Sequence, residues 1–140
     1  MKLFINTDGG SRGNPGPAGI GAIVKDEKGS ILLEIGEFIG ETTNNQAEYR
    51  ALLRALKGVS EIADLETSSL DLEIRMDSEL IVRQMQGRYK IKDLGLKPVA
   101  EEVLKLCKNF RSVNFSHVPR EQNKEADKLV NMALDAALKV

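Results

Sequence analysis

The hydrophobic pattern of the chain changes its period near residue 43, and this change limits the possible folds most strongly. Before it, three short apolar runs have the length and the bounding turn residues of β-strands. They cover Lys2–Asp8, Gly19–Lys25 and Ile31–Phe38. The polar turn Asp26–Ser30 joins the second run to the third. The chain is therefore predicted to open as an antiparallel meander.

After residue 43 the pattern alternates between helix and strand. Apolar residues recur at helical spacing from Ala47 to Val59, and Thr43 with Gln46, or Asn45 with Glu48, provides a capping box. The later predicted elements are a strand up to Met76, a short helix capped by Asp77 or Ser78 and ending at Met85, a helix over Lys97–Phe110, a strand over Val113–His117 and a helix over Asn123–Leu138. The order β-β-β-α-β-α-α-β-α predicts one α/β domain over residues 1–140, with a mixed sheet of about five strands and helices on its faces.

Charge and cysteine content restrict the class of protein. Lys and Arg number 20 and Asp and Glu 21, so any binding of nucleic acid needs a local basic patch. The one cysteine, Cys107, lies on the apolar face of a predicted helix, where a core thiol is expected and a disulfide within the chain is impossible. No signal peptide and no long apolar run are present. We expect a cytoplasmic protein without a membrane anchor, and a monomer.

Four acidic residues are predicted to meet at one edge of the sheet. Functional sites in α/β sheets gather beyond the carboxyl ends of parallel strands, and Asp8 and Asp77 each end a predicted strand. Glu48 and Asp127 lie near the starts of helices that point toward the same edge. Taken singly, each acid has an ordinary explanation as a turn residue, a helix cap or a favourable charge at a helix start.

Four converging carboxylates need a cation between them, because their mutual repulsion costs stability. All four are oxygen ligands, which indicates Mg²⁺ or Mn²⁺, and two such ions can stabilise both oxygens of a phosphodiester displacement. No Cys and His cluster with zinc spacing occurs in the sequence.

Four sequence blocks resemble type I ribonuclease H, most closely its compact archaeal and bacterial branch. They are "TDGGSRGNPGPAGIGA", "TTNNQAEYRAL", "MDSELIV" and "VPREQNKEADKLVN", in the family's order and spanning nearly the whole chain. The resemblance implies the ribonuclease H fold and cleavage of the RNA strand of an RNA–DNA hybrid. It also implies that Asp8, Glu48, Asp77 and Asp127 bind two divalent metal ions. Whether double-stranded RNA is also cut stays open.

Further residues are predicted to contact the substrate. Gly9 and Gly10 let the main chain approach a ligand closely, and Asn14 by resemblance contacts the substrate backbone. Amide and hydroxyl groups suit recognition of a 2′-hydroxyl, which indicates Thr43, Asn44 and Asn45. Well-known members carry a basic protrusion that contains Trp. This chain has no Trp, and the corresponding loop offers only Arg88, Lys90 and Lys92.

Two residues compete for a role in proton transfer or product release. His117 is the only histidine, ten residues before Asp127, and Arg120 lies in the intervening loop. We expect Arg120 to contribute more. Glu79 stands where some members have a substrate-contacting glutamine, and its role is open. The sequence leaves two alternative functions open. The protein could be a hybrid-binding module without turnover, or a different nuclease of the same superfamily.

Overall fold

The first part of the chain forms the expected meander in the computed structural model, which describes residues 1–62 and 65–139. The strand β1 (Lys2–Ser11) pairs antiparallel with β2 (Gly16–Lys25), which pairs antiparallel with β3 (Ile31–Thr42). All three strands extend beyond their predicted bounds at the end near the glycine-rich turn. Ladder hydrogen bonds between neighbours hold these extra residues extended, although glycine is a poor strand former.

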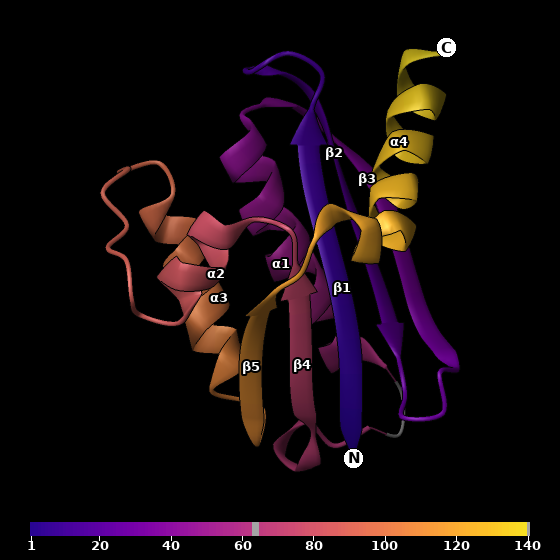
Figure 1. Ribbon diagram of the computed structural model, residues 1–140, viewed down its shortest axis with the longest axis vertical. Coiled ribbons are helices and arrows are strands. Elements are labelled where there is room, and N and C mark those ends of the chain that lie inside the picture. Colours follow the sequence, from indigo (N-terminus) through magenta and orange to yellow (C-terminus); the bar gives the residue numbers. More distant parts are fainter. Residues whose placement is uncertain (63–64, 140) are drawn as a thin grey trace.

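Two shorter strands complete the sheet in parallel. The strand β4 (Asp71–Met76) pairs with β1, and β5 (Ser112–His117) pairs with β4, which gives the order β3-β2-β1-β4-β5. The predicted five-stranded mixed sheet is confirmed. Its two edges are β3 and β5, and β1 lies at its centre (Figure 1).

The described residues form four α-helices, of which the first three lie between strands and the fourth follows β5. They are α1 (Asn44–Glu61), α2 (Glu79–Met85), α3 (Lys97–Cys107) and α4 (Lys124–Leu138), with short 3₁₀ turns η1 (Thr67–Ser69) and η2 (Arg120–Gln122). Thr43 caps α1 by accepting a hydrogen bond from the Gln46 amide at 3.2 Å. Ser78 caps α2 in the same way through the Ile81 amide at 3.4 Å. Both caps fall among the residues predicted for them.

The helix α3 ends three residues before its predicted end at Phe110. The amides of Lys108 and Phe110 donate to carbonyls three residues earlier, so the chain tightens into turns there. Phe110 is nevertheless buried in the core. Cys107 is half-buried against this core, and burial raises the pKa of its thiol to about 11. The expectation of a core thiol is thus met in part.

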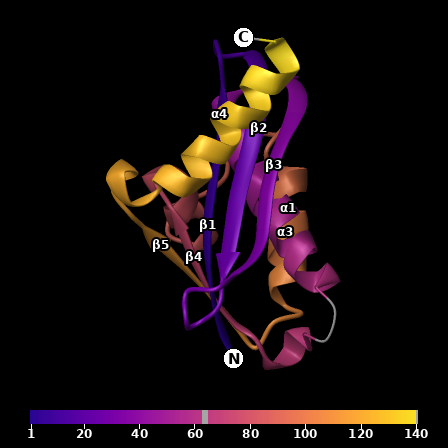
Figure 2. The same cartoon turned by 90° about the vertical axis from the view of Figure 1, so that its right-hand side faces the viewer.

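The helices cover the two faces of the sheet unequally. Figure 2 shows α1 and α3 on one side of the sheet and α4 on the other. The main core lies under α1, where buried side chains of β1 and β4 such as Leu3, Ile5 and Ile74 meet Leu52 and Leu56. The helix α4 packs mainly against β2, β3 and β1. No helix in the described ranges is long and apolar enough to cross a bilayer.

Candidate active site

Asp8 stands where β1 and β4 separate. The parallel pairing of these strands ends at Asn6 and Arg75, while β1 continues to Ser11 in pairing with β2 alone. The prediction that Asp8 ends the strand was therefore wrong, because the β2 ladder carries β1 further. Asp8 still lies beyond the carboxyl end of the parallel pair, and Asp77 directly follows the last residue of β4. Both acids thus reach the predicted edge of the sheet.

A glycine brings α1 and its Glu48 close to this edge. A Cβ on Gly9 would stand 2.3 Å from the main-chain carbon of Ala47 and 2.6 Å from the amide nitrogen of Glu48. Only a residue without a side chain permits this distance between β1 and α1. The residue beside Asp8 in the sequence therefore decides how near Glu48 lies to it.

A second glycine does the same for α4 on the opposite face. Gly21 pairs with Asp8 across the β1–β2 ladder, and a Cβ on it would stand 2.3 Å from the carbonyl oxygen of Ala126. Ala126 precedes Asp127 in α4. Gly21 therefore lets the start of α4 lie directly against β2.

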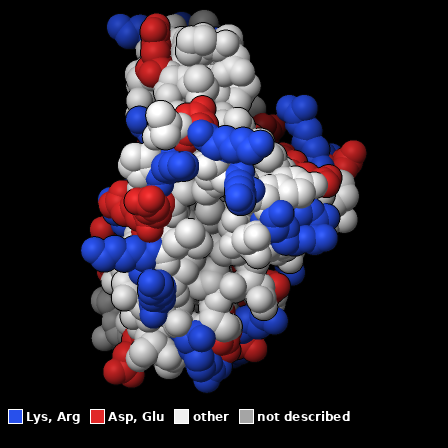
Figure 3. Space-filling model, turned by 90° about the vertical axis from the view of Figure 1, so that its left-hand side faces the viewer, with Lys and Arg blue, Asp and Glu red and all other residues white. Residues whose placement is uncertain are grey.

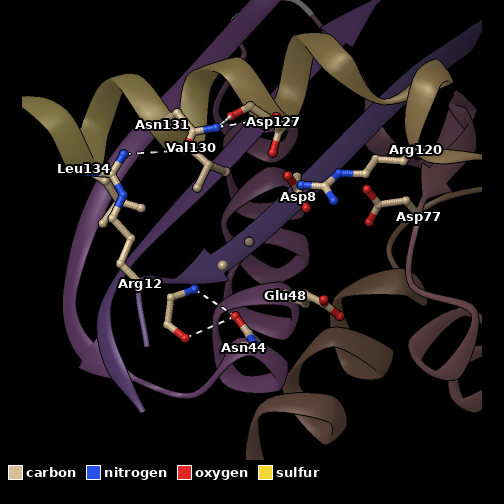
Figure 4. Close-up of a pocket in the computed structure, with 13 residues that line it drawn as sticks. Asp8, Arg12, Asn44, Glu48, Asp77, Arg120, Asp127, Val130, Asn131 and Leu134 are labelled. Carbon is tan, nitrogen blue, oxygen red and sulfur yellow. Dashed lines mark hydrogen bonds between the residues drawn. The ribbon is translucent and has the colours of Figure 1, made fainter. Parts of the chain in front are cut away.

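All four predicted carboxylates line one cavity of about 420 Å³ (Figure 4). The cavity also contacts Gly9, Gly10, Ser11, Arg12, Asn44, Arg120, Val130, Asn131 and Leu134. The acids come from β1, α1, the end of β4 and the first turn of α4. Segments far apart in the sequence therefore meet at the site, as predicted.

The electrostatics of the cavity favour protonated carboxyl groups in the absence of a cation. Burial raises the pKa of Asp8 to about 8, with added repulsion from Asp77, Asp127 and Glu48. Burial likewise raises the pKa of Glu48 to about 7, with repulsion from Asp77, while a hydrogen bond from Ser78 opposes the shift. Bringing these charges together has a cost that a bound cation would offset.

The donor set fits a hard divalent cation. Four carboxylates offer only oxygen atoms, and the buried Oε2 of Glu48 has no hydrogen-bond partner in the part of the chain that the structure describes. Among residues 1–62 and 65–139, however, no three His, Cys, Asp or Glu side chains lie close enough to hold one ion as they stand. An ion held by one or two of these carboxylates would complete its coordination with water or phosphate oxygens, as Mg²⁺ commonly does.

Arg120 and His117 occupy different places. Arg120 lies in η2 and lines the cavity, with its side chain extending toward the acidic groups in Figure 4. His117 ends β5 opposite Met76, is exposed and does not line the cavity. The structure therefore brings Arg120 to the carboxylates and leaves His117 outside this cavity.

The predicted substrate residues at the start of α1 are partly engaged already. Asn44 lines the cavity, and its Oδ1 accepts hydrogen bonds from the Ser11 amide at 2.8 Å and the Ser11 hydroxyl at 3.0 Å. Asn14 accepts a hydrogen bond from the Asn44 amide at 3.1 Å, and Thr43 is occupied as the helix cap. Asn45 is exposed and outside the cavity lining. The side-chain amide nitrogen of Asn44 is the group best placed to meet a ligand here.

Arg88 and Lys90 lie outside the cavity, in the exposed loop between α2 and α3. Figure 3 shows Lys and Arg side chains gathered over the face that carries these helices, around a less charged central area. The loop also exposes 50% of Tyr89 and 79% of Leu94, which sequence reasoning overlooked. An aromatic residue between two basic ones is the signal that could have identified Tyr89.

Sequence reasoning also missed a polar group on α4. Asn131 donates hydrogen bonds to the main-chain oxygen of Asp127 at 3.1 Å and to its carboxylate at 3.4 Å. Arg12 forms an ion pair with Asp135 at 2.6 Å and lines the same cavity. The spacing of Asn131 four residues after Asp127 could have indicated this contact.

Comparison with known proteins agrees with this geometry. A family model described as reverse transcriptase-like matches residues 6–133. The structure of LC11-RNase H1, isolated from compost by a metagenomic approach, shares 52% identity over 98% of each chain with a TM-score of 0.91. The chain belongs to the type 1 ribonuclease H family. Ribonuclease H1 of the archaeon Halobacterium salinarum is similarly related in structure, at 38% identity, coverage of 97% of this chain and 99% of that one, and a TM-score of 0.89.

Some ribonuclease H relatives are longer than this chain. This chain is 44% identical over 138 residues to the bifunctional protein Rv2228c of Mycobacterium tuberculosis, and the match covers 98% of this chain and 36% of that protein. The chain thus spans about a third of the length of this curated relative.

LC11-RNase H1 has also been crystallised in complex with an RNA/DNA hybrid. That structure superposes on this chain with a TM-score of 0.92 at 51% identity, over 97% of this chain and 99% of that one.

Proposed function

We propose that this chain is an endoribonuclease that hydrolyses the RNA strand of RNA–DNA hybrids and leaves 3′-hydroxyl and 5′-phosphate ends. The observation that carries the proposal is the convergence of four carboxylates in one cavity of a ribonuclease H fold. LC11-RNase H1, which shares 51% sequence identity with this chain and was crystallised with an RNA/DNA hybrid, supports the same substrate class. We propose one ribonuclease H domain over residues 1–140, acting as a monomer in the cytoplasm.

Asp8, Glu48, Asp77 and Asp127 would hold two divalent cations, Mg²⁺ or Mn²⁺. Such ions would stabilise the charge that develops on the attacking and leaving oxygens of a phosphodiester. The four side chains contribute the negative charge that attracts the ions and the oxygen atoms that bind them. Support comes from the orphaned Oε2 of Glu48 and from the raised pKa values of Asp8 and Glu48.

Arg120 would hold the phosphate group next to the carboxylates. A guanidinium keeps its proton near neutral pH, so it acts by charge and hydrogen bonding rather than by proton transfer. Its position in the cavity lining supports this role. His117 stays a weaker candidate for assisting product release, because it is exposed and outside the lining.

The rest of the substrate would be held on both sides of the carboxylates. Gly10 and Asn44 line the cavity. The side-chain amide nitrogen of Asn44 could donate a hydrogen bond to a 2′-hydroxyl of the RNA strand. Gly9, Asn14, Thr43 and Asn45 would contribute main-chain or side-chain contacts around this point. Arg88 and Lys90, with Tyr89 between them, would contact the hybrid away from the cavity.

A cleavage assay tests the proposal. A uniformly labelled RNA–DNA hybrid is incubated with the protein in Mg²⁺, in Mn²⁺ or in EDTA, beside single-stranded RNA, double-stranded DNA and double-stranded RNA. We expect metal-dependent cleavage of the hybrid at internal positions, with 5′-phosphate on the products. Binding of the hybrid without cleavage in either metal would favour the hybrid-binding module. Preferential cleavage of a DNA substrate would favour another nuclease of the superfamily. Cleavage of the double-stranded RNA would extend the substrate range.

A further inference from the structure

The start of α4 is attached to β1 by one buried side chain, Asn123. Where the β1–β4 ladder stops after Asn6, the Thr7 carbonyl accepts a hydrogen bond from the Asn123 side-chain amide at 2.9 Å. Asn123 is 1% exposed, and Thr7 is fully buried. A buried carbonyl without a partner is costly, so this amide replaces the bond that a neighbouring strand would otherwise supply.

Asn6 holds Asn123 from the strand side. Its side-chain amide donates to the Oδ1 of Asn123 at 3.0 Å and to the main-chain oxygen of Gln122 at 3.3 Å. Both side-chain groups of Asn123 are therefore bonded to β1, one to a carbonyl and one to a side chain. Asn6 and Asn123 together fix the register between β1 and the segment 120–127.

The same residue is bonded to both functional residues of that segment through its main chain. The Asn123 amide donates to the Arg120 carbonyl at 3.0 Å, and the Asp127 amide donates to the Asn123 carbonyl at 3.1 Å. Asn123 is the N-cap of α4, yet its side chain makes no capping hydrogen bond. Asparagine at this place commonly caps the helix with its side chain. Here the side chain bonds β1 instead, which points to a tertiary role.

We propose that Asn123, held by Asn6, is a positioning residue that sets Arg120 and Asp127 against Asp8. Asn123 bonds Thr7, the residue that precedes Asp8 on β1. A single side-chain amide therefore joins the strand that carries Asp8 to the start of the helix that carries Asp127. An ion pair between Lys25 on β2 and Glu125 on α4, at 2.8 Å, also lies at this end of the helix, but it is exposed and contributes little. The catalytic consequence rests on the proposed function, whereas the positioning itself does not.

The test compares Asn123→Ala and Asn6→Ala with a control of lowered stability, Val103→Ala. Val103 is fully buried on α3 and does not line the cavity. All measurements are made at one temperature well below every Tm. They are amide hydrogen exchange over residues 120–128, calorimetric binding of Mn²⁺ without substrate, and kcat and KM on one hybrid.

For Asn123→Ala we expect faster exchange at Asp127 and its neighbours, whereas Val103→Ala leaves these amides protected as in the unmodified protein. Mn²⁺ affinity and kcat should each fall about tenfold or more, with KM within about threefold, because the carboxylates and Arg120 lose their alignment. Asn6→Ala should produce a smaller change in the same direction. The Arg120→Ala substitution should cost less in the Asn123→Ala background than alone.

Unchanged exchange in the segment 120–128 of Asn123→Ala would overturn the positioning role, whatever the activity. Equal losses of Mn²⁺ affinity in Asn123→Ala and Val103→Ala would reduce Asn123 to a contributor to stability. If the unmodified protein cleaves no hybrid, the proposed function fails, and hydrogen exchange and Mn²⁺ binding still decide whether Asn123 positions the segment.

Discussion

Gly9 and Ala47 are in direct main-chain contact, because a Cβ on Gly9 would stand 2.3 Å from the main-chain carbon of Ala47. Two secondary structure elements that carry acidic residues, β1 and α1, therefore lie closer together than any side chain at position 9 would allow. This contact, and not only the spacing of acids in the sequence, determines where Glu48 lies relative to Asp8.

Substituting Gly9 by Ala should therefore separate β1 from α1. We expect Gly9→Ala to lower the free energy of unfolding by about 1–3 kcal/mol through overpacking against main-chain atoms that cannot rotate away. Gly10→Ala is the matched control, because its Cβ would meet only the Asn44 Oδ1 at 3.9 Å. The control should change stability by about 0.5 kcal/mol or less in urea denaturation. Equal stability of both variants would show that α1 can shift without cost.

The stability of the metal-free protein should fall as pH rises from about 5 to about 8. The pKa values of Asp8 and Glu48 are raised to about 8 and about 7, so the folded protein holds protons that the unfolded chain has released. Stability from these groups is complete below their ordinary pKa values near 4 and is lost as pH passes the raised values. We would measure Tm in EDTA across this range. A Tm that rises toward pH 8 would contradict the raised pKa values that burial and the neighbouring carboxylates cause.

Asp77→Asn should separate activity from stability. The substitution keeps the shape of the side chain and removes a charge that raises the pKa values of both Asp8 and Glu48. We expect metal-dependent cleavage to fall about a hundredfold or more, since a metal ligand is removed. Without metal, Tm at pH 8 should be equal or higher, and its decrease with pH should be shallower. Near-normal cleavage by this variant would disprove the four-carboxylate site.

Arg120→Ala should reduce turnover more than His117→Ala. Arg120 lines the cavity, and loss of a charge-stabilising group costs about tenfold or more in kcat. His117 is exposed outside the lining, so we expect its removal to change kcat by about threefold or less. Steady-state kinetics from pH 6 to pH 9 on one hybrid would compare them. A larger loss in His117→Ala, with a changed pH profile, would reverse the assignment.

Affinity for the hybrid should depend weakly on salt concentration, because Arg12 and Arg120 are the basic residues that line the cavity. Replacing Arg88, Lys90 and Lys92 by Ala should weaken binding and lower the salt slope by about 0.9 for each phosphate that the protein no longer neutralises. Dissociation constants would be measured across a salt series in Ca²⁺, chosen to suppress cleavage. Lys28→Ala, in the β2–β3 turn, is a control that should leave the slope unchanged. A steep slope that survives the triple substitution would reveal another basic surface.

The sequence alone determined the order of elements and the identity of the acids that meet. Hydrophobic period and capping residues are local properties, so they predicted the helices and strands. For each of two caps they left two candidates, of which the structure selects Thr43 and Ser78. Because strand ends and helix starts share one edge of such a sheet, the convergence of the four carboxylates followed from their positions in these elements.

Tertiary structure decided how far each element extends and which side chains are still available. Asp8 lies within β1 because a partner strand continues beside it, and no local pattern reveals where a ladder stops. The Oδ1 of Asn44 is taken by Ser11, 33 residues away, and Asn123 bonds Thr7, 116 residues away. Hydrophobic period depends on neighbours within a few turns, whereas these hydrogen bonds depend on main-chain groups that only the assembled sheet brings within reach.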